Sequence, residues 1–265
     1  MQKLKNLLAA LPEPEIIDLD ALRASLSDGG TELVCVLGPT ASGKTRYAVQ
    51  LAHELGSGAE IISADSRQVY RRMDIGTGKD LSEYGDVPYH LIDIAEPGTQ
   101  YNVFRFKQDF SKAYEDIRGR GGIPILCGGT GLYINAVTGG YDFRDSKPLS
   151  AAPAEPAAGA PKTFFIGTLV SREVRNARID ARLDARLKEG MVEEIKSLLD
   201  EGVPAETLIS YGLEYKFVTL YLTGQLDYAS MRERLAIAIH QFAKRQMTWF
   251  RGMERSGVRI HWVEV

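Results

Sequence analysis

Residues 33–45 read LVCVLGPTASGKT, a short apolar run that leads into a loop punctuated by glycines. The run from Leu33 to Leu37 predicts a buried strand, and a helix is expected from about Lys44 to Leu55. Between them, residues 38–45 match the pattern G-x-x-x-x-G-K-[ST] in the strand-to-helix context that this motif requires. The full match disfavours the alternative, a strand–helix turn that is merely rich in glycine.

The predicted phosphate loop comprises Gly38, Pro39, Thr40, Ala41, Ser42, Gly43, Lys44 and Thr45. Its glycines let consecutive backbone N–H groups point at one anion, and the N-terminus of the following helix adds positive partial charge. Lys44 supplies a mobile cation for the terminal phosphates, and the Thr45 hydroxyl is placed to hold Mg²⁺. The motif therefore predicts a bound phosphate chain with Mg²⁺, without specifying ATP.

The rest of the chain extends this start into an α/β fold. Buried strands are expected at residues 60–63, 89–94, 123–127 and 164–169. Helices are expected at residues 104–120, 171–188, 191–201, 205–223 and 227–252. Strands that alternate with helices predict a P-loop NTPase-like parallel sheet flanked by helices, here with a helical C-terminal region.

Shifts in composition divide the chain into four parts. Residues 1–30 read as a helical extension that Gly29-Gly30 closes, and residues 31–140 as the P-loop core. Residues 141–163 read as a linker, because the stretch from 146 to 162 holds six Ala and four Pro and has no apolar period. Residues 164–265 hold the last core strand and the C-terminal helices.

The bulk composition is that of a globular protein. The 265 residues are 44% hydrophobic and 25% charged, with a formal net charge of −3 that attracts no nucleic acid in general. Residues 166–265 carry 15 Lys/Arg against 14 Asp/Glu, so an anionic partner is better expected there. Cys35 and Cys127 lie in apolar runs, which predicts buried strand residues rather than a disulfide or a metal site. With no secretory signal and no apolar run of about 18 residues, we expect a cytoplasmic location. We also expect a monomer.

Seven further motifs follow one another along the chain. They are SADSRQVYRRMDIGTGK at 63–79, HLIDI at 90–94, YNVFRFKQDF at 101–110, GGTGLYINAV at 128–137, ARIDARLDARL at 177–187, GMVEEIKSLL at 190–199 and AKRQMTWFR at 243–251. Together with GPTASGKT they resemble the tRNA dimethylallyltransferase family, also called isopentenyl-diphosphate:tRNA or IPP transferases. The combination of DSRQVY, GGTGLY and KRQMTWFR is highly specific, and the resemblance covers residues 33–137 and 164–252.

The resemblance implies a reaction and the residues that perform it. In that family the P-loop holds the diphosphate of dimethylallyl diphosphate with Mg²⁺. The dimethylallyl group passes to the N6 amine of adenine 37 in tRNA, beside the anticodon, and diphosphate is released. By resemblance, Asp65 is the general base, Arg178 stabilises charge on the departing diphosphate, and Thr130 lines the reaction channel and contacts the diphosphate. Ser66 and Gln68 match positions that contact the flipped adenine and neighbouring groups.

The residue types alone also allow structural alternatives. An Asp that follows a strand, such as Asp65, commonly caps a turn. His90 lies at the start of a predicted strand and is expected to be packed and hydrogen-bonded rather than catalytic. One helix face carries four arginines with Asp180 and Asp184 between them, which favours a solvated face of ion pairs over a binding face. These arginines are Arg175, Arg178, Arg182 and Arg186.

The motif at 243–251 mixes aromatic and basic residues. Trp249 and Phe250 are expected in the core. Lys244 and Arg245, like Arg251, suit phosphate contacts and ordinary charge on a helix surface equally well. We take Lys244 and Arg245 as candidate contacts to the anticodon stem-loop of tRNA.

The chain departs from the family pattern in two places. The family usually carries a helical insertion that grips the anticodon stem-loop, and here only residues 138–163 occupy that interval. Residues 210–217, SYGLEYKF, replace a shorter Gly-Tyr-Lys/Arg pattern. Three hypotheses therefore stay open: transfer to tRNA, transfer to a free adenine nucleotide as in cytokinin-forming relatives, and a non-catalytic protein that only binds a diphosphate. Intact Asp65, Thr130 and Arg178 argue against the third, and the basic C-terminal segment favours the first over the second.

Overall fold

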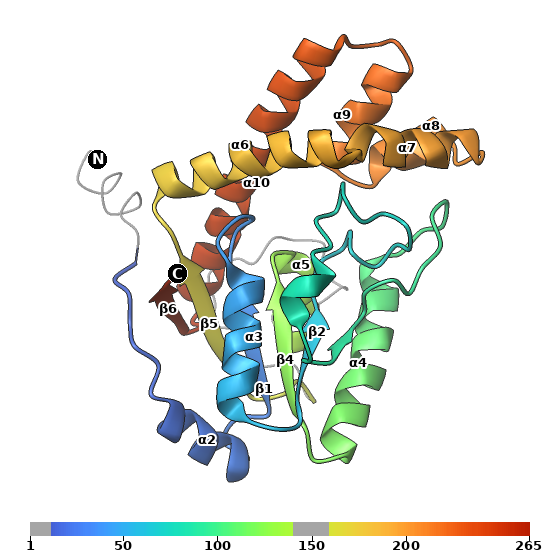
Figure 1. Ribbon diagram of the computed structural model, residues 1–265. Helices are drawn as coiled ribbons and strands as arrows, with labels where there is room; N and C mark the ends of the chain where they lie inside the picture. The colour runs from blue at the N-terminus through green and yellow to red at the C-terminus, as the bar shows by residue number, and fades with distance from the viewer. Residues whose placement is uncertain (1–11, 140–158) are drawn as a thin grey trace.

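The fold is a parallel β-sheet with helices on both faces (Figure 1). The computed structural model of the chain describes residues 12–139 and 159–265. In these residues the sheet has six strands in the order β3-β2-β4-β1-β5-β6, and every neighbouring pair is parallel. The strands are β1 (Leu33–Leu37), β2 (Ala59–Ser63), β3 (Tyr89–His90), β4 (Ile123–Gly128), β5 (Thr163–Leu169) and β6 (Ile260–Glu264). The predicted α/β fold class is confirmed.

The central strand β1 is buried on both of its faces. Val34 and Val36 point into one hydrophobic cluster, whereas Leu33, Cys35 and Leu37 point into the other. Because both faces must be apolar, the strand reads as a continuous hydrophobic run instead of an alternating one.

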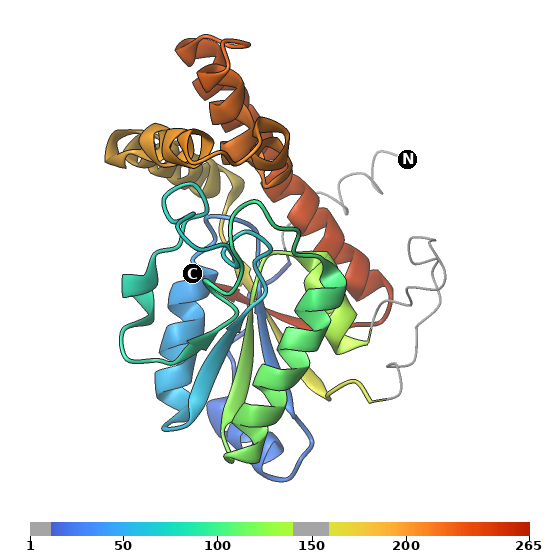
Figure 2. The ribbon, with the colours of Figure 1, turned by 90° about the vertical axis from the view of Figure 1, so that its right-hand side faces the viewer.

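Helices form two covering layers and a third group above the sheet. They are α2 (Leu19–Ser27), α3 (Lys44–Leu55), the 3₁₀ turn η1 (Leu81–Tyr84), α4 (Val103–Gly119), α5 (Gly131–Thr138), α6 (Arg172–Glu189), α7 (Met191–Asp200), α8 (Ala205–Ser210), α9 (Leu213–Leu222) and α10 (Tyr228–Arg255). The side chains of α2 and α3 pack on one face of the sheet, and those of α4, α5 and α10 on the other. In Figure 1, α6 crosses above the carboxyl ends of the strands, and Figure 2 shows α10 running from this upper layer down beside the sheet.

This topology brings three loops to one edge of the sheet. β2, β4 and β1 are adjacent and parallel, so the segments that leave their carboxyl ends start side by side. These segments are the phosphate loop after β1, the turn at Asp65 after β2 and the turn at Gly129-Thr130 after β4. Ligands of open parallel sheets bind at this edge.

Most predicted elements lie within one or two residues of the observed ones, and three predictions need correction. The strand expected at 89–94 stops at His90, because Leu91 and Asp93 adopt left-handed backbone conformations with φ of 63° and 56°. The helix expected at 205–223 is two helices, interrupted at Gly212, whose backbone (φ 154°, ψ −176°) lies in a region that favours glycine. The sheet also has a sixth strand, β6, where the sequence predicts none.

Two of the predicted parts fall partly outside the described residues. Residues 1–11 of the N-terminal extension and residues 140–158, most of the predicted linker, are not described, whereas α2 lies within the extension. In residues 12–139 and 159–265, no helix combines the length and the apolarity needed to cross a membrane.

Candidate active site

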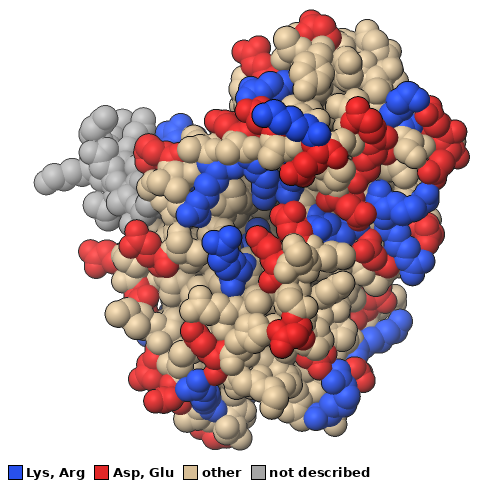
Figure 3. Space-filling view, viewed as in Figure 1, with Lys and Arg blue, Asp and Glu red and all other residues tan. Residues whose placement is uncertain are grey.

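A cavity of about 760 Å³ lies at the carboxyl edge of the sheet. Its walls come from the phosphate loop, from the turns after β2 and β4, and from side chains of α6 and α10. Lys and Arg side chains gather on this face below α6 (Figure 3). The volume suits a small-molecule ligand.

The phosphate loop depends on two of its glycines. Gly43, at the start of α3, has φ of 82°, and a Cβ at this position would also lie 2.9 Å from Val265 Cγ1. A Cβ on Gly38 would lie 2.1 Å from Thr168 Oγ1, which bonds Ser42 Oγ at 2.7 Å. The loop is therefore packed tightly against β5 and β6. Within the loop, Lys44 lies at the cavity wall, where burial lowers the pKa of its ammonium.

The C-terminal helices hold the phosphate loop at Thr40. The backbone N–H of Thr40 donates to Gln246 Oε1 at 2.8 Å, and Gln246 Nε2 donates to the Gly129 carbonyl at 2.9 Å. From α6, Arg182 Nη2 donates to Thr40 Oγ1 at 2.5 Å. The phosphate loop, the turn after β4 and the helices α6 and α10 thus form one connected frame.

The cavity has an excess of positive charge. Its lining contains seven basic side chains, Lys44, Arg46, Arg67, Arg178, Arg182, Arg186 and Arg245. The acidic side chains of the lining are Asp65, Asp80, Glu83 and Glu214. Burial, and secondarily the nearby charge of Arg186, lower the pKa of Arg182 to about 10. Clustered cations with reduced hydration stabilise a bound polyanion such as a diphosphate.

The arginines of α6 do not form the solvated face that their spacing favours. Arg175 and Arg186 are buried, Arg182 is half-buried, and Arg178 is exposed. The interleaved aspartates lie against α10 instead: Asp184 pairs with Arg232 at 2.8 Å, and Asp180 Oδ1 lies 2.9 Å from His240 Nε2. The solvated-face interpretation is therefore wrong for three of the four arginines. It failed because helical spacing shows which residues share a face but not what that face meets.

Asp65 both caps a turn and lines the cavity. Its Oδ1 accepts the backbone N–H of Arg67 at 2.9 Å, the local role that its position after a strand suggests. Among the described residues, Oδ2 takes no hydrogen bond and is available to a ligand. Thr130 Oγ1 accepts the Ser66 backbone N–H at 3.3 Å, which joins the turns after β2 and β4. Asp65, Ser66, Gln68 and Thr130 all line the one cavity.

The residues of the motif at 243–251 on α10 lie in three places: the cavity wall, the surface and the core. Arg245 lines the cavity and lies 5.9 Å from the centre of the Phe242 ring, whereas Lys244 is exposed and outside the described lining. Phe250 is fully buried, as expected. Trp249 was expected in the core, but it is 39% exposed and lines the cavity, where its indole covers Gly131.

The sequence did not single out every residue of the cavity. Within the phosphate loop, Gly38, Pro39 and Ser42 shape the backbone, and the residues of this loop in the described lining are Thr40, Ala41, Gly43, Lys44 and Thr45. Arg46, Arg182 and Gln246 were not predicted as site residues. The sequence shows the helical spacing of Arg182 and the KRQ triplet that contains Gln246. It does not show their contacts to Thr40, because these join residues more than 140 positions apart.

The two cysteines and His90 are placed as expected. Cys35 and Cys127 are buried and free, and Cys127 also lines the cavity, where burial raises the pKa of its thiol to about 12. His90 is half-buried, and its Nε2 lies 2.7 Å from Glu60 Oε2. Among the described residues, no group of three or more His, Cys, Asp or Glu side chains could hold a metal ion.

Comparisons with known proteins agree in one family. A family model described as IPP transferase matches residues 68–160 and 143–253, and one described as isopentenyl transferase matches residues 31–84. The chain is 49% identical to tRNA dimethylallyltransferase 1 of Porphyromonas gingivalis, over 88% of this chain and 93% of that protein. It is 47% identical to tRNA dimethylallyltransferase 1 of Parabacteroides distasonis, over 88% and 92%. A crystal structure of the tRNA isopentenylpyrophosphate transferase of Bacillus halodurans is 32% identical with a TM-score of 0.76, over 88% of this chain and 89% of that one.

The alignments also show a gap in this chain. The match to the Porphyromonas gingivalis protein extends over 284 positions, although 88% of 265 residues is about 233. About 50 aligned positions therefore lack a residue of this chain. The two matches to the IPP transferase model overlap at residues 143–160, within the interval that the sequence marks as shortened.

Proposed function

This chain belongs to the tRNA dimethylallyltransferase (IPP transferase) family, and from that premise we propose that it transfers a dimethylallyl group from dimethylallyl diphosphate to the N6 amine of adenine 37 in tRNA. One observation carries the proposal for this chain. Three loops that follow different strands line a single cavity with excess positive charge: the phosphate loop, the turn at Asp65 and the turn at Thr130. A diphosphate and an amine could therefore meet there.

The donor diphosphate would lie on the phosphate loop. Lys44 and three arginines of α6, Arg178, Arg182 and Arg186, line the cavity beside this loop. The Thr45 hydroxyl would hold Mg²⁺, which when bound neutralises charge on the leaving group. The described residues include no group of three or more His, Cys, Asp or Glu side chains that could hold a metal, which fits this ion, because Mg²⁺ at phosphate sites takes most of its ligands from phosphate oxygens and water.

The acceptor chemistry falls to Asp65. The N6 amine of adenine is a weak nucleophile, because its lone pair is delocalised into the ring. As the nitrogen attacks the allylic carbon, a C–N bond forms and the C–O bond to the diphosphate breaks, with the bonding electrons leaving on the diphosphate. The proton released from the amine would pass to the carboxylate of Asp65, a general-base role. Thr130, Arg178 and Arg182 would stabilise the charge that develops on the departing group.

Dimethylallyl diphosphate with Mg²⁺ is expected to raise the melting temperature of the protein, and ATP with Mg²⁺ to raise it far less. A ligand that binds only the folded state stabilises it by about 2.7 kcal/mol at a concentration of 100 Kd. The measurement is a thermal-shift titration with both ligands over the same concentrations. Equal or greater stabilisation by ATP would contradict this choice of donor.

Transfer to an unmodified anticodon stem-loop is expected, with binding that weakens steeply as salt rises. The two family-model matches overlap at residues 143–160, the interval in which the resemblance implies an RNA-gripping insertion, and about 50 aligned positions lack a residue of this chain. We therefore expect Lys and Arg on the C-terminal helices, including Lys244 and Arg245, to provide the phosphate contacts. About three such contacts would lower the affinity roughly 20- to 40-fold between about 50 and 200 mM salt.

The acceptor experiment offers stem-loop, AMP, ADP and ATP to the same enzyme with labelled donor, at low and at moderate salt. A free nucleotide needs no such contacts, and its use should depend much less on salt. Transfer to a nucleotide with none to the stem-loop would overturn the tRNA proposal in favour of an adenylate dimethylallyltransferase. Donor binding without any transfer would favour a non-catalytic role.

A further inference from the structure

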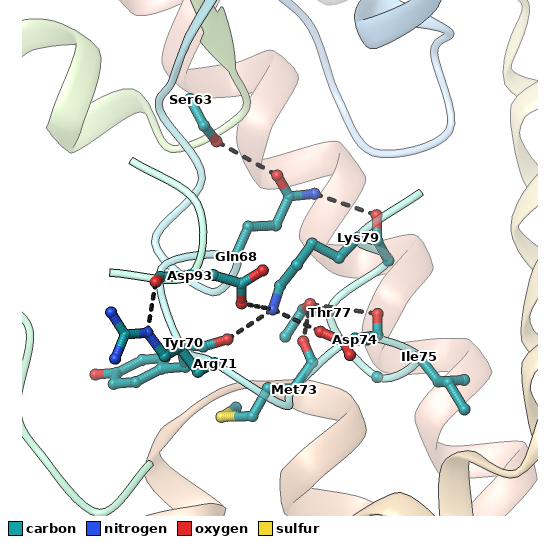
Figure 4. Close-up of polar contacts among 12 residues, drawn as sticks. Ser63, Gln68, Tyr70, Arg71, Met73, Asp74, Ile75, Thr77, Lys79 and Asp93 are labelled. Atoms are coloured by element: carbon teal, nitrogen blue, oxygen red, sulfur yellow. Dashed lines mark hydrogen bonds and ion pairs between the residues drawn. The ribbon is translucent and has the colours of Figure 1, made fainter. Parts of the chain in front are cut away.

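Lys79 is a fully buried cation outside the reaction cavity. Its side chain has 0% exposure, and its Nζ donates to Asp74 Oδ1 at 2.7 Å, to Asp93 Oδ1 at 2.5 Å and to the Tyr70 carbonyl at 2.7 Å (Figure 4). Three acceptors satisfy all three ammonium hydrogens. A buried lysine is costly to retain unless it is paired in this way, so the chain uses Lys79 to hold these segments together.

The segment that Lys79 holds is a tight turn at residues 73–79. The backbone N–H of Lys79 donates to the Asp74 carbonyl at 3.0 Å, and the N–H of Gly78 donates to the Ile75 carbonyl at 3.2 Å. Asp93 anchors this turn to the rest of the site, because its own N–H donates to the Gln68 carbonyl at 3.1 Å while its side chain binds Lys79. Its left-handed backbone, with φ of 56°, makes both contacts possible and explains why β3 ends early.

Side chains of α7 and α9 bind the same turn from the side opposite Lys79. The carboxylate of Glu194 on α7 accepts the backbone N–H groups of Asp74, Ile75 and Gly76 at 2.8, 2.8 and 3.0 Å. Tyr215 on α9 donates its hydroxyl to Glu194 at 2.6 Å, and its ring lies where a Cβ on Gly76 would be. The turn is therefore a fixed part of the molecule and not a loose loop.

A chain of hydrogen bonds leads from this turn to Asp65. The Gly78 carbonyl accepts from Gln68 Nε2 at 3.1 Å, and Gln68 Oε1 accepts from Ser63 Oγ at 3.3 Å. Ser63 Oγ in turn accepts the backbone N–H of Asp65 at 3.3 Å. The position of the Gly78 carbonyl thus decides which way the Gln68 amide faces, because a reversed amide would place two oxygens together.

We propose that Lys79 is a positioning residue for the acceptor base: it fixes the turn whose Gly78 carbonyl orients the amide of Gln68 toward adenine. The inference rests on the proposed function, since it takes adenine as the acceptor. An oriented Gln amide keeps one N–H and one oxygen lone pair for a ligand. That pair matches an adenine edge, on which the N6 amine donates and a ring nitrogen accepts.

The test is a double-mutant cycle of Lys79→Met and Gln68→Ala, with Lys196→Met as the matched control. Lys196 is 59% exposed on α7 and pairs with Asp200 in the next turn, so its loss removes a lysine but touches no loop of the site. Lys79→Met is expected to lower kcat/KM for the acceptor roughly 10- to 100-fold, because small displacements of a positioned group are costly. KM for the donor should change by about twofold or less, and Lys196→Met should match the wild type.

The cycle separates positioning from general loosening. If Lys79 acts through Gln68, Lys79→Met lowers kcat/KM for the acceptor little further when Gln68 is already Ala. The fold-losses of the two single variants then do not multiply in the double variant. Losses that multiply in full, or an equal loss of donor affinity, would overturn the proposal. Should Lys79→Met not fold, Asp74→Asn removes one ion pair and retains the other, and it is expected to give a smaller loss that also vanishes in the Gln68→Ala background.

The acceptor in this cycle is whichever of the stem-loop and the adenine nucleotides the wild type uses. Acceptor binding by fluorescence anisotropy is the second readout, and it requires no turnover. If the tRNA proposal is wrong, the wild type itself transfers nothing to the stem-loop. If the Lys79 proposal is wrong, Lys79→Met keeps the acceptor Kd and kcat/KM of the wild type.

Discussion

Asp65→Asn is expected to lower kcat by roughly 10²–10⁴-fold, the usual cost of losing a positioned general base. The substitution is a sharp test because the turn should survive it. An asparagine oxygen can still accept the backbone N–H of Arg67, which Oδ1 now accepts at 2.9 Å, so the loop after β2 keeps its shape. What is lost is the capacity to take a proton from the amine.

Donor binding provides the internal control for this variant. The diphosphate would lie on Lys44 and Thr45, so the thermal shift with dimethylallyl diphosphate should stay near that of the wild type. Asp86→Asn is the matched surface change, since the Asp86 side chain is 88% exposed. Transfer at a near wild-type rate by purified Asp65→Asn would mean that another group accepts the proton.

The fold could be predicted largely because its decisive features are local. The run at 33–37 and the loop at 38–45 are contiguous, and their geometry follows from burial on both faces and from glycine backbone freedom. β6 was missed for the opposite reason. Its five residues, IHWVE, pair with β5 only after the chain has passed through five helices, and so short a run does not by itself indicate a strand.

The candidate site could be predicted only in part, for a related reason. The turns that carry Asp65 and Thr130 lie in motifs that the sequence displays as units. The contacts of Gln246 and Arg182 with Thr40 depend on how α10 and α6 sit against the phosphate loop, which no local pattern encodes. Trp249 shows the same limit, because an aromatic residue at a helical position fits a core and a cavity wall equally well.

Arg182→Met is expected to lower kcat by roughly 10²–10³-fold, the usual cost of losing one preorganised group that stabilises developing charge. Arg182 is half-buried at the cavity wall and reaches the phosphate loop at Thr40 Oγ1, 2.5 Å away. A cation shielded from water acts strongly on a diphosphate, whereas the exposed Arg178, one turn earlier on α6, is screened by solvent. Arg178→Met should therefore cost only about tenfold or less. A larger loss of kcat for Arg178→Met than for Arg182→Met would mean that Arg178 is the main group that stabilises charge on the departing diphosphate.

The stability of the same variant tests the physical reason for this expectation. Burial and the charge of Arg186 hold the pKa of Arg182 at about 10, below the ordinary value of an arginine. A cation whose pKa is lower in the folded state than in the unfolded state opposes folding at every pH at which it remains charged in the unfolded chain. Arg182→Met, which removes the charge, should therefore leave the melting temperature unchanged or raise it, although kcat falls. A clear fall in melting temperature would instead mean that Arg182 is chiefly a structural tie between α6 and the phosphate loop, and that its effect on kcat comes from a displaced Thr40.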